Sequence, residues 1–161
     1  MPVRRSPGVE ILLLLRWTVV AGELTPAAVT KLGPYITRYA ETLNTRVHAV
    51  GGVADHLHLL ADIPPDMPAE RVSKELHAPT ARYLRDVLNV RDFAWEVAGV
   101  SVVSVSPGER ELVVAYLADQ EARHASGDLI PAYESGGAAT VVPASTGEEL
   151  PGWLVDAMKR G

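Results

Sequence analysis

The chain of 161 residues has the length of one domain and is long enough to bury a hydrophobic core. It contains no cysteine, which excludes disulfides, thiolate metal sites and cysteine nucleophiles. Its net charge is −5, which argues against a generic nucleic-acid-binding domain, although more than half of this excess lies in residues 127–161. The apolar run of residues 9–15 is too short to span a membrane, and no signal-type cleavage site follows the N-terminal arginines. We therefore expect a cytoplasmic protein.

The first part of the chain predicts a strand, a helix and a second strand. Residues 9–17 are rich in Leu, Val and Ile, as in a strand that is buried on both faces. Thr25-Pro26 is typical of a helix N-cap and first position, and apolar residues follow at helical spacing to residue 44. Gly33-Pro34 predicts a kink or a later start of this helix. Residues 45–53 predict the next strand.

The run Asp55–Leu60 carries two histidines, at i and i+2, between Gly51-Gly52 and Pro64-Pro65. A short alternating run between such breakers predicts a β-strand that forms a hairpin with the strand before it. Successive strand residues point to opposite faces, so His56 and His58 share one face. Two adjacent imidazoles can hold a divalent metal ion. A hydrogen-bonded or half-exposed histidine pair is the alternative interpretation.

Two helices and a strand are expected in the next sixty residues. Asp66 can cap a helix over residues 68–88, which Pro79 is expected to bend or split. Residues 94–105 predict a strand, with Gly99 at a bulge or a close backbone approach. Ser106-Pro107-Gly108-Glu109 has the pattern of a capping box, and the helix that it begins should continue to Ala125.

The element order is β-α-β-β-α-β-α. This order predicts an α+β fold of the ferredoxin-like, split βαβ type, in which an antiparallel sheet has helices on one face and a C-terminal helix is added. Residues 1–126 are expected to form this domain. Residues 127–149 are rich in Gly, Ala, Ser, Thr and Pro, and we interpret residues 127–161 as a linker and a short C-terminal arm.

The last helix has a polar group inside an apolar face. At 100° per residue, one face about 140° wide holds Leu112, Val113, Tyr116, Leu117, Gln120 and His124. A buried amide without partners costs about 1–3 kcal/mol, so a polar partner should meet Gln120. The face of the sheet that carries His56 and His58 is the best candidate. Tyr116 could also be an ordinary core tyrosine, and His124 a cation in the last turn of the helix.

These motifs resemble the single-tyrosine HUH transposases, which include the insertion sequence 200-like enzymes and the REP-associated tyrosine transposases. The resemblance covers residues 9–125. It rests on His56-Leu57-His58 followed by Ala-Asp-Ile-Pro-Pro, then Trp95, then Ser104-Val105-Ser106, and on the run from Tyr116 through Gln120 to His124. The strand and the Tyr-x-x-x-Gln helix, in this order and about sixty residues apart, are the specific parts.

The resemblance implies a metal-dependent transesterification on single-stranded DNA. His56, His58 and Gln120 would hold Mg²⁺ or Mn²⁺, and Tyr116 would attack the scissile phosphate to give a 5′-phosphotyrosine and a free 3′-OH. Asp55 and His124 would support the ligands. Such enzymes are homodimers, so a homodimer is expected.

The expected DNA partner is single-stranded, with hairpin ends as a further possibility. Lys74, Arg82 and Arg85 on the second helix are the candidates for DNA contacts. The family's basic pattern on this helix is reduced here to Thr80 and Arg82. This reduction and the acidity of the chain suggest the first of two alternative functions that remain open. One is a non-catalytic DNA-binding or regulatory relative, and the other is a metal-assisted hydrolase of a small phosphoester.

Overall fold

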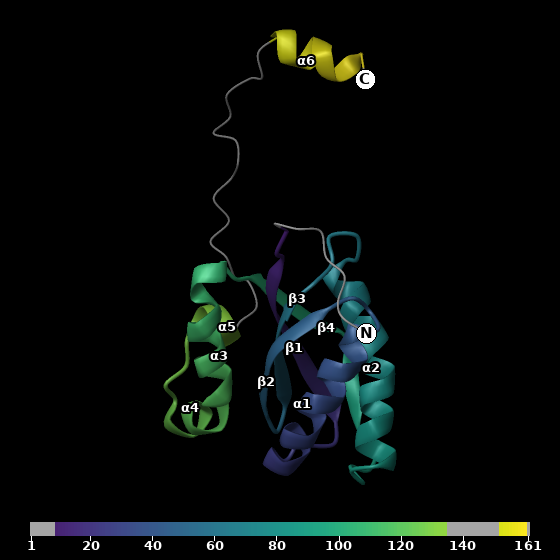
Figure 1. The fold of residues 1–161 in the computed structure, drawn as a ribbon, viewed down its shortest axis with the longest axis vertical. Coiled ribbons are helices and arrows are strands. Elements are labelled where there is room, and N and C mark those ends of the chain that lie inside the picture. Colours follow the sequence, from purple (N-terminus) through teal and green to yellow (C-terminus); the bar gives the residue numbers. More distant parts are fainter. Residues whose placement is uncertain (1–8, 135–151, 161) are drawn as a thin grey trace.

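The computed structural model describes residues 9–134 and 152–160, and it contains a four-stranded antiparallel sheet (Figure 1). The strands are β1 (Leu12–Ala21), β2 (Arg46–Val53), β3 (His56–Asp62) and β4 (Ala94–Ser104). Their order is β2-β3-β1-β4, and every neighbouring pair is antiparallel. A split βαβ fold has this order, because each crossover helix leaves room for one strand between the two that it joins. The predicted α+β class is thus confirmed.

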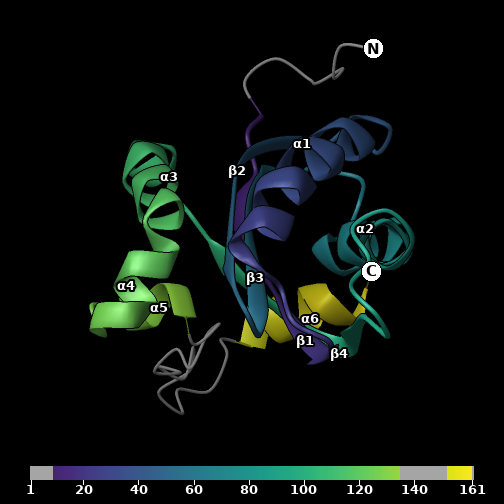
Figure 2. The same cartoon turned by 90° about the horizontal axis from the view of Figure 1, so that it is seen from below.

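Helices α1 (Pro26–Glu41) and α2 (Ala69–Asp86) cover one face of the sheet (Figure 2). The hydroxyl oxygen of Thr25 accepts a hydrogen bond from the backbone N–H of Ala28, which is the N-cap that the sequence predicts. Odd-numbered residues of β1 and β3 point to this side. The main core lies here and includes Leu15, Trp17, Leu32, Ile36, Leu57, Leu59, Leu76 and Leu84.

The opposite face of the sheet carries the C-terminal helices. These are α3 (Arg110–Ala118), α4 (Gln120–Ser126) and the short α5 (Pro131–Glu134), and they lie together on one side of the sheet in Figure 2. Even-numbered residues of β1 and β3 meet them in a second core, which consists of Leu12, Leu14, Leu60, Val105, Val113, Tyr116, Leu117 and Tyr133. The two histidines of β3 are also even-numbered, so they point to this second side.

Several predicted boundaries are wrong. Strand β1 continues four residues beyond Trp17 and ends before Gly22, which has a φ of 80°. Helices α1 and α2 run without interruption through Pro34 and Pro79. Each proline removes only one backbone donor, and the apolar face of each helix remains packed on the sheet.

The last helix differs most from its prediction. It begins as a 3-10 turn over Pro107–Glu109, and the side chain of Ser106 makes no capping hydrogen bond. It is then interrupted at Asp119, whose φ of −106° and ψ of 14° are not helical. Leu112 is 58% exposed, although the sequence analysis placed it on the buried face of this helix. At 100° per residue Leu112 lies at the edge of that face, whereas Val113, Tyr116 and Leu117 are buried.

The compact part of the chain includes residues beyond the expected boundary at 126. Gly127, with a φ of 75°, ends α4, and Tyr133 on α5 is buried in the second core. Residues 135–151, most of the predicted linker, lie outside the described residues. Helix α6 (Gly152–Lys159) has no buried residue. Within residues 9–134 and 152–160, no helix is long and apolar enough to cross a membrane.

Helix α3 packs closely on the edge strand β2 at Gly51. A Cβ atom on Gly51 would overlap the carbonyl oxygen of Leu117 and would lie 3.0 Å from its carbonyl carbon. The backbones of β2 and α3 therefore touch directly, and only glycine allows this contact. The contact sets the distance between the sheet and the helix that carries Tyr116.

We expect Gly51→Ala to destabilise the fold by about 1–3 kcal/mol, because α3 must move away from β2. Chemical denaturation monitored by circular dichroism measures the change. Gly108→Ala is the matched control, since nothing lies within 4 Å of the added carbon at that position. Equal free energies of unfolding for the two variants would contradict the close packing.

A half-buried histidine packs against the main core, although the sequence suggested that it would be at the surface. The ring of His77 lies edge-on to Trp17, with centroids 4.7 Å apart, and stacks on Trp95 at 5.8 Å. The indole N–H groups of these tryptophans donate to the hydroxyls of Ser73 and Thr80, at 3.0 Å each. Burial lowers the pKa of His77 to about 4.

This burial predicts a loss of stability in acid. Because the pKa of His77 is lower in the folded chain than in the unfolded chain, the unfolded chain binds more protons between pH 4 and 6.5. The free energy of unfolding should therefore be highest above pH 6.5 and should fall as the pH drops towards 4. His77→Phe keeps an aromatic ring without a titratable nitrogen. Urea denaturation across this range should show a shallower fall for the variant, and an identical pH dependence would refute the assignment.

Candidate active site

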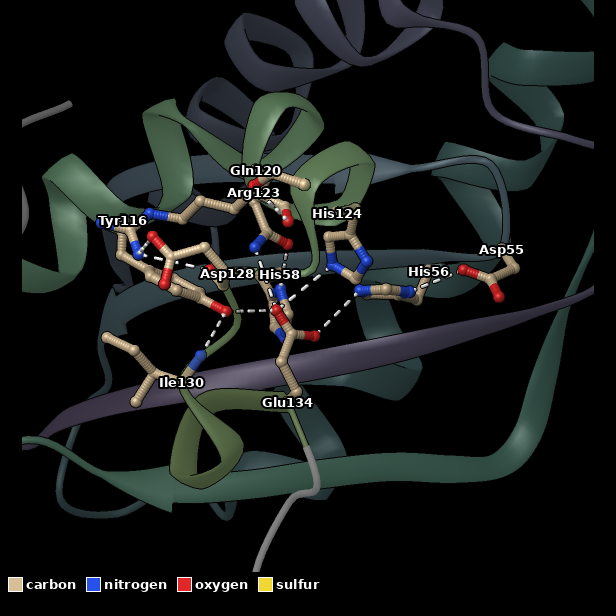
Figure 3. Close-up of polar contacts among 11 residues, drawn as sticks. Asp55, His56, His58, Tyr116, Gln120, Arg123, His124, Asp128, Ile130 and Glu134 are labelled. Carbon is tan, nitrogen blue, oxygen red and sulfur yellow. Dashed lines mark hydrogen bonds and ion pairs between the residues drawn. The ribbon is translucent and has the colours of Figure 1, made fainter.

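Five polar side chains from three parts of the chain meet on the second face of the sheet (Figure 3). His56 and His58 come from β3, Tyr116 from the last turn of α3, Gln120 from the first turn of α4, and Glu134 from the end of α5. The first four are between 0% and 2% exposed. The structure thus brings together the two histidines, the tyrosine and the glutamine that the sequence singled out.

Hydrogen bonds at one ring nitrogen orient both histidines. Nδ1 of His56 lies 2.7 Å from a carboxylate oxygen of Asp55, and Nδ1 of His58 lies 2.8 Å from Oε1 of Gln120. Both partners are acceptors, so each Nδ1 carries the proton and each Nε2 presents a lone pair. Both Nε2 atoms are buried and have no hydrogen-bond partner. Metal-binding histidines have this arrangement, in which the outer nitrogen is held and the inner one is free to coordinate.

The carboxylate of Glu134 lies at the centre of the cluster. Its Oε2 is 3.2 Å from Nε2 of His56 and 3.8 Å from Nε2 of His58. Its Oε1 accepts hydrogen bonds from the Tyr116 hydroxyl at 2.6 Å and from the Gln120 amide at 3.0 Å. Nε2 of His124 lies 3.2 Å from the same oxygen. One side chain thus connects the histidines to the tyrosine.

The Tyr116 side chain is fixed on several sides. Its hydroxyl accepts the backbone N–H of Ile130 at 3.2 Å while it donates to Glu134. The guanidinium of Arg123 lies 4.8 Å from the ring centroid, and the ring of Tyr133 packs edge-on at 5.2 Å. Three of these partners lie in residues 127–134, so this segment positions the tyrosine.

The environment sets the charges of the cluster near neutral pH. Burial lowers the pKa of His56 and lowers that of His58 to about 4, so both rings are neutral. Burial alone would raise the pKa of Glu134, but the hydrogen bonds that its carboxylate accepts from Tyr116 and Gln120 outweigh this effect and lower it to about 2. Burial and the bond to Glu134 raise the pKa of Tyr116 to about 12. The phenol is thus protonated and needs a cation nearby to become a nucleophile.

The donors of the cluster fit a divalent metal ion. Among the described residues, His56, His124 and Glu134 offer ligand atoms that all lie within 4.8 Å of one another. The buried Nε2 atoms of His56 and His58 have no hydrogen-bond partner, and an ion would satisfy both lone pairs. Imidazole nitrogens and a carboxylate oxygen suit Mn²⁺, and Mg²⁺ also accepts such oxygen ligands.

The other predicted site residues lie on two opposite faces of the sheet. Asp55 and His124 lie in the cluster. Lys74, Arg82 and Arg85 are on α2, across the sheet from the cluster, and Arg85 donates a hydrogen bond to the carbonyl of Phe93 at 2.9 Å. The structure does not bring these three side chains to the histidines, and their role in DNA contacts stays a prediction.

Glu134 is the residue that sequence analysis missed. It was placed in the linker because its surroundings are rich in small residues. A weak signal was present, since Pro131 can begin a helical turn and Tyr133 gives that turn one large apolar side chain. The contact with the histidines, about eighty residues earlier in the chain, had no signal in the sequence.

Comparison with known proteins supports the resemblance of the motifs. The family described as "Transposase IS200 like" matches residues 19–120, which is more than half of the chain. The chain belongs to the IS200-like transposase family. No curated protein matches this chain significantly in sequence. The family match ends at Gln120, so it includes both histidines and Tyr116 but not Glu134.

Two solved structures share the fold of this IS200-like transposase. One is a protein from Deinococcus radiodurans R1 assigned as a transposase, with 19% identity and a TM-score of 0.54, and the match covers 74% of this chain and 98% of that one. The other is a REP-associated tyrosine transposase bound to a REP hairpin. It has 13% identity and a TM-score of 0.53, and the match covers 94% of this chain and 99% of that one.

The packing of α5 yields a stability prediction. Tyr133 is 8% exposed and packs on Tyr116 in the second core. We expect Tyr133→Ala to lower the free energy of unfolding by about 3 kcal/mol, because it leaves a cavity beside Tyr116. Trp153→Ala is a control in α6, where Trp153 is 73% exposed. Chemical denaturation of both variants gives the values. A change no larger for Tyr133→Ala than for Trp153→Ala would show that α5 is not part of the folded domain.

Proposed function

We propose that this transposase cleaves and rejoins single-stranded DNA through a covalent tyrosine intermediate. One observation carries the proposal: the Tyr116 hydroxyl and the lone-pair nitrogens of His56 and His58 converge on a single carboxylate. A nucleophile and two free imidazole nitrogens within one buried cluster can act on the same phosphate group.

The proposed reaction is a transesterification. The Tyr116 oxygen attacks the scissile phosphorus, the bond from phosphorus to the 3′ oxygen breaks, and the phenol proton is balanced by the proton gained by the departing 3′-OH. The 5′ end of the DNA stays bound to Tyr116 as a phosphotyrosine. Attack by a 3′-OH on this bond reverses the step and rejoins a strand without ATP, because the number of phosphodiester bonds is unchanged.

The proposed ion would be Mg²⁺ or Mn²⁺, held by His56 and His58. Gln120, which the sequence suggested as a third ligand, has its Oε1 on Nδ1 of His58, so we propose that it orients this ring instead. When bound, it would polarise the phosphate and stabilise the charge of the attacking oxygen. The protein holds the two rings in the required tautomer through Asp55 and Gln120. It also keeps the hydroxyl of Tyr116 at a fixed position on the same side of the sheet.

The DNA partner and the assembly are part of the same proposal. The REP-associated relative is bound to a hairpin, which supports a single-stranded substrate with hairpin ends for this chain. Lys74, Arg82 and Arg85 would contact DNA from α2, away from the reacting phosphate. We also propose a homodimer. The Tyr116 and histidines of one chain lie in the same cluster, so one protomer could supply the whole site.

The central test is covalent adduct formation. The protein is incubated with single-stranded DNA that carries candidate hairpin ends and with Mn²⁺, and adducts are resolved on a denaturing gel. We expect an adduct with the unmodified protein, its loss in Tyr116→Phe and after chelation, and its retention in Tyr39→Phe. Tyr39 is a suitable control because it is a partly exposed tyrosine on α1, away from the cluster.

The same experiment separates the alternatives. An undiminished adduct in Tyr116→Phe would eliminate Tyr116 as the nucleophile. Salt-sensitive DNA binding without any adduct would identify a non-catalytic DNA-binding relative. Turnover of a small phosphodiester that persists in Tyr116→Phe would favour a hydrolase instead.

A further inference from the structure

We propose that Glu134 is an anionic metal ligand that also positions the nucleophile, so that one carboxylate bridges the ion and Tyr116. In this arrangement Oε2 coordinates the ion beside His56 and His58, while Oε1 keeps its hydrogen bond to the Tyr116 hydroxyl. The inference rests on the proposed metal-dependent function, and it adds a residue from outside the part of the chain that matches the family.

The distances between donor atoms fit shared coordination. Ligands about 2.1 Å from one ion, at angles between about 90° and 110°, lie roughly 3.0–3.4 Å from each other. Oε2 of Glu134 is 3.2 Å from Nε2 of His56 and 3.8 Å from Nε2 of His58. The three atoms can surround one ion after small shifts. Both nitrogens are buried and lack a hydrogen-bond partner, and both side chains are at least nine-tenths buried.

A divalent ion in this cluster would also need the negative charge of the Glu134 carboxylate. Neutral imidazoles and an amide supply no negative charge to balance a divalent ion, and a buried unbalanced charge is costly. Among the described residues, the other acidic side chain beside the histidines is Asp55, whose carboxylate accepts a hydrogen bond from Nδ1 of His56 and whose side chain is 80% exposed. Asp55 therefore faces the outer nitrogen. The Glu134 side chain is 13% exposed and faces the inner nitrogens.

The second carboxylate oxygen holds the nucleophile. Oε1 accepts from the Tyr116 hydroxyl at 2.6 Å, and Gln120 and His124 flank the same oxygen. Tyr133, the residue before Glu134, packs on the Tyr116 ring. Helix α5 thus holds both the ring and the hydroxyl of Tyr116 and links them to the histidines.

Metal binding by the purified full chain tests the inference without DNA. Mn²⁺ affinity is measured by calorimetry and by electron paramagnetic resonance for the unmodified protein, Glu134→Gln, His56→Ala and Glu121→Gln. Glu134→Gln keeps the shape of the side chain but removes its charge. Glu121→Gln removes the same charge from an exposed position on α4 and serves as the control. Thermal unfolding without metal verifies that each variant is folded.

We expect Glu134→Gln to weaken Mn²⁺ binding by roughly tenfold or more and Glu121→Gln to leave it unchanged. The rise in melting temperature with Mn²⁺ should shrink in the same variant, because only binding to the folded state stabilises it. If Glu134→Gln does not fold, Glu134→Asp replaces it, and its shorter side chain should weaken binding in the same direction.

The possible results distinguish this inference from the proposed function. Equal or tighter Mn²⁺ binding in Glu134→Gln, with binding lost in His56→Ala, would refute the role of Glu134 and leave the metal site standing. Tighter binding would show instead that the carboxylate blocks the site. An unmodified protein that binds no Mn²⁺, or binds it equally well without His56, would overturn the metal site itself and this inference with it.

Discussion

The contacts of the Glu134 carboxylate, whose side chain is 13% exposed, are the interaction on which the candidate site depends. It lies against the two histidines of β3 and accepts hydrogen bonds from Tyr116 and Gln120. A largely buried carboxylate needs hydrogen-bond donors, and here the Tyr116 hydroxyl and the Gln120 amide supply them. The two histidines and these two donors lie about sixty residues apart in the sequence. The carboxylate thus connects the C-terminal helices to β3 through the polar groups of the cluster.

The two faces of the sheet have different roles. Its first face packs against α1 and α2 in the larger core, and its second face carries the smaller core and the reactive groups. The strand pleat makes this separation possible, because alternate residues of β3 serve opposite faces. Helix α3 lies close enough to the second face for its side chains to reach the histidines, because Gly51 lets the backbone of α3 touch β2. The positions of Tyr116 and Gln120 thus depend on a residue that takes no part in the chemistry.

Much of the fold could be predicted from local patterns, and the failures have identifiable causes. The element order and the facing of His56 and His58 follow from breakers and alternation, which are local properties. The prediction of one straight last helix was wrong, because the non-helical residue Asp119 divides it into α3 and α4. Tyr116 and Gln120 nevertheless both face the sheet and are buried on either side of this interruption. His77 on α2 was predicted to be a surface residue because its partners, Trp17 and Trp95, come from the distant strands β1 and β4.

The sequence by itself determined the order of the elements and which side chains of β3 and of the last helix share a face, because the period of a strand or helix decides this. The resemblance of its motifs to the IS200-like transposases indicated the family, and it singled out the four residues that meet at the site. Only the tertiary structure decided that Glu134 enters the cluster, that Gln120 and Asp55 orient the imidazoles, and that Lys74, Arg82 and Arg85 lie across the sheet. The physical reason is that such contacts depend on how separate elements pack, and a short turn that follows a stretch of small residues carries no local sign of its partners.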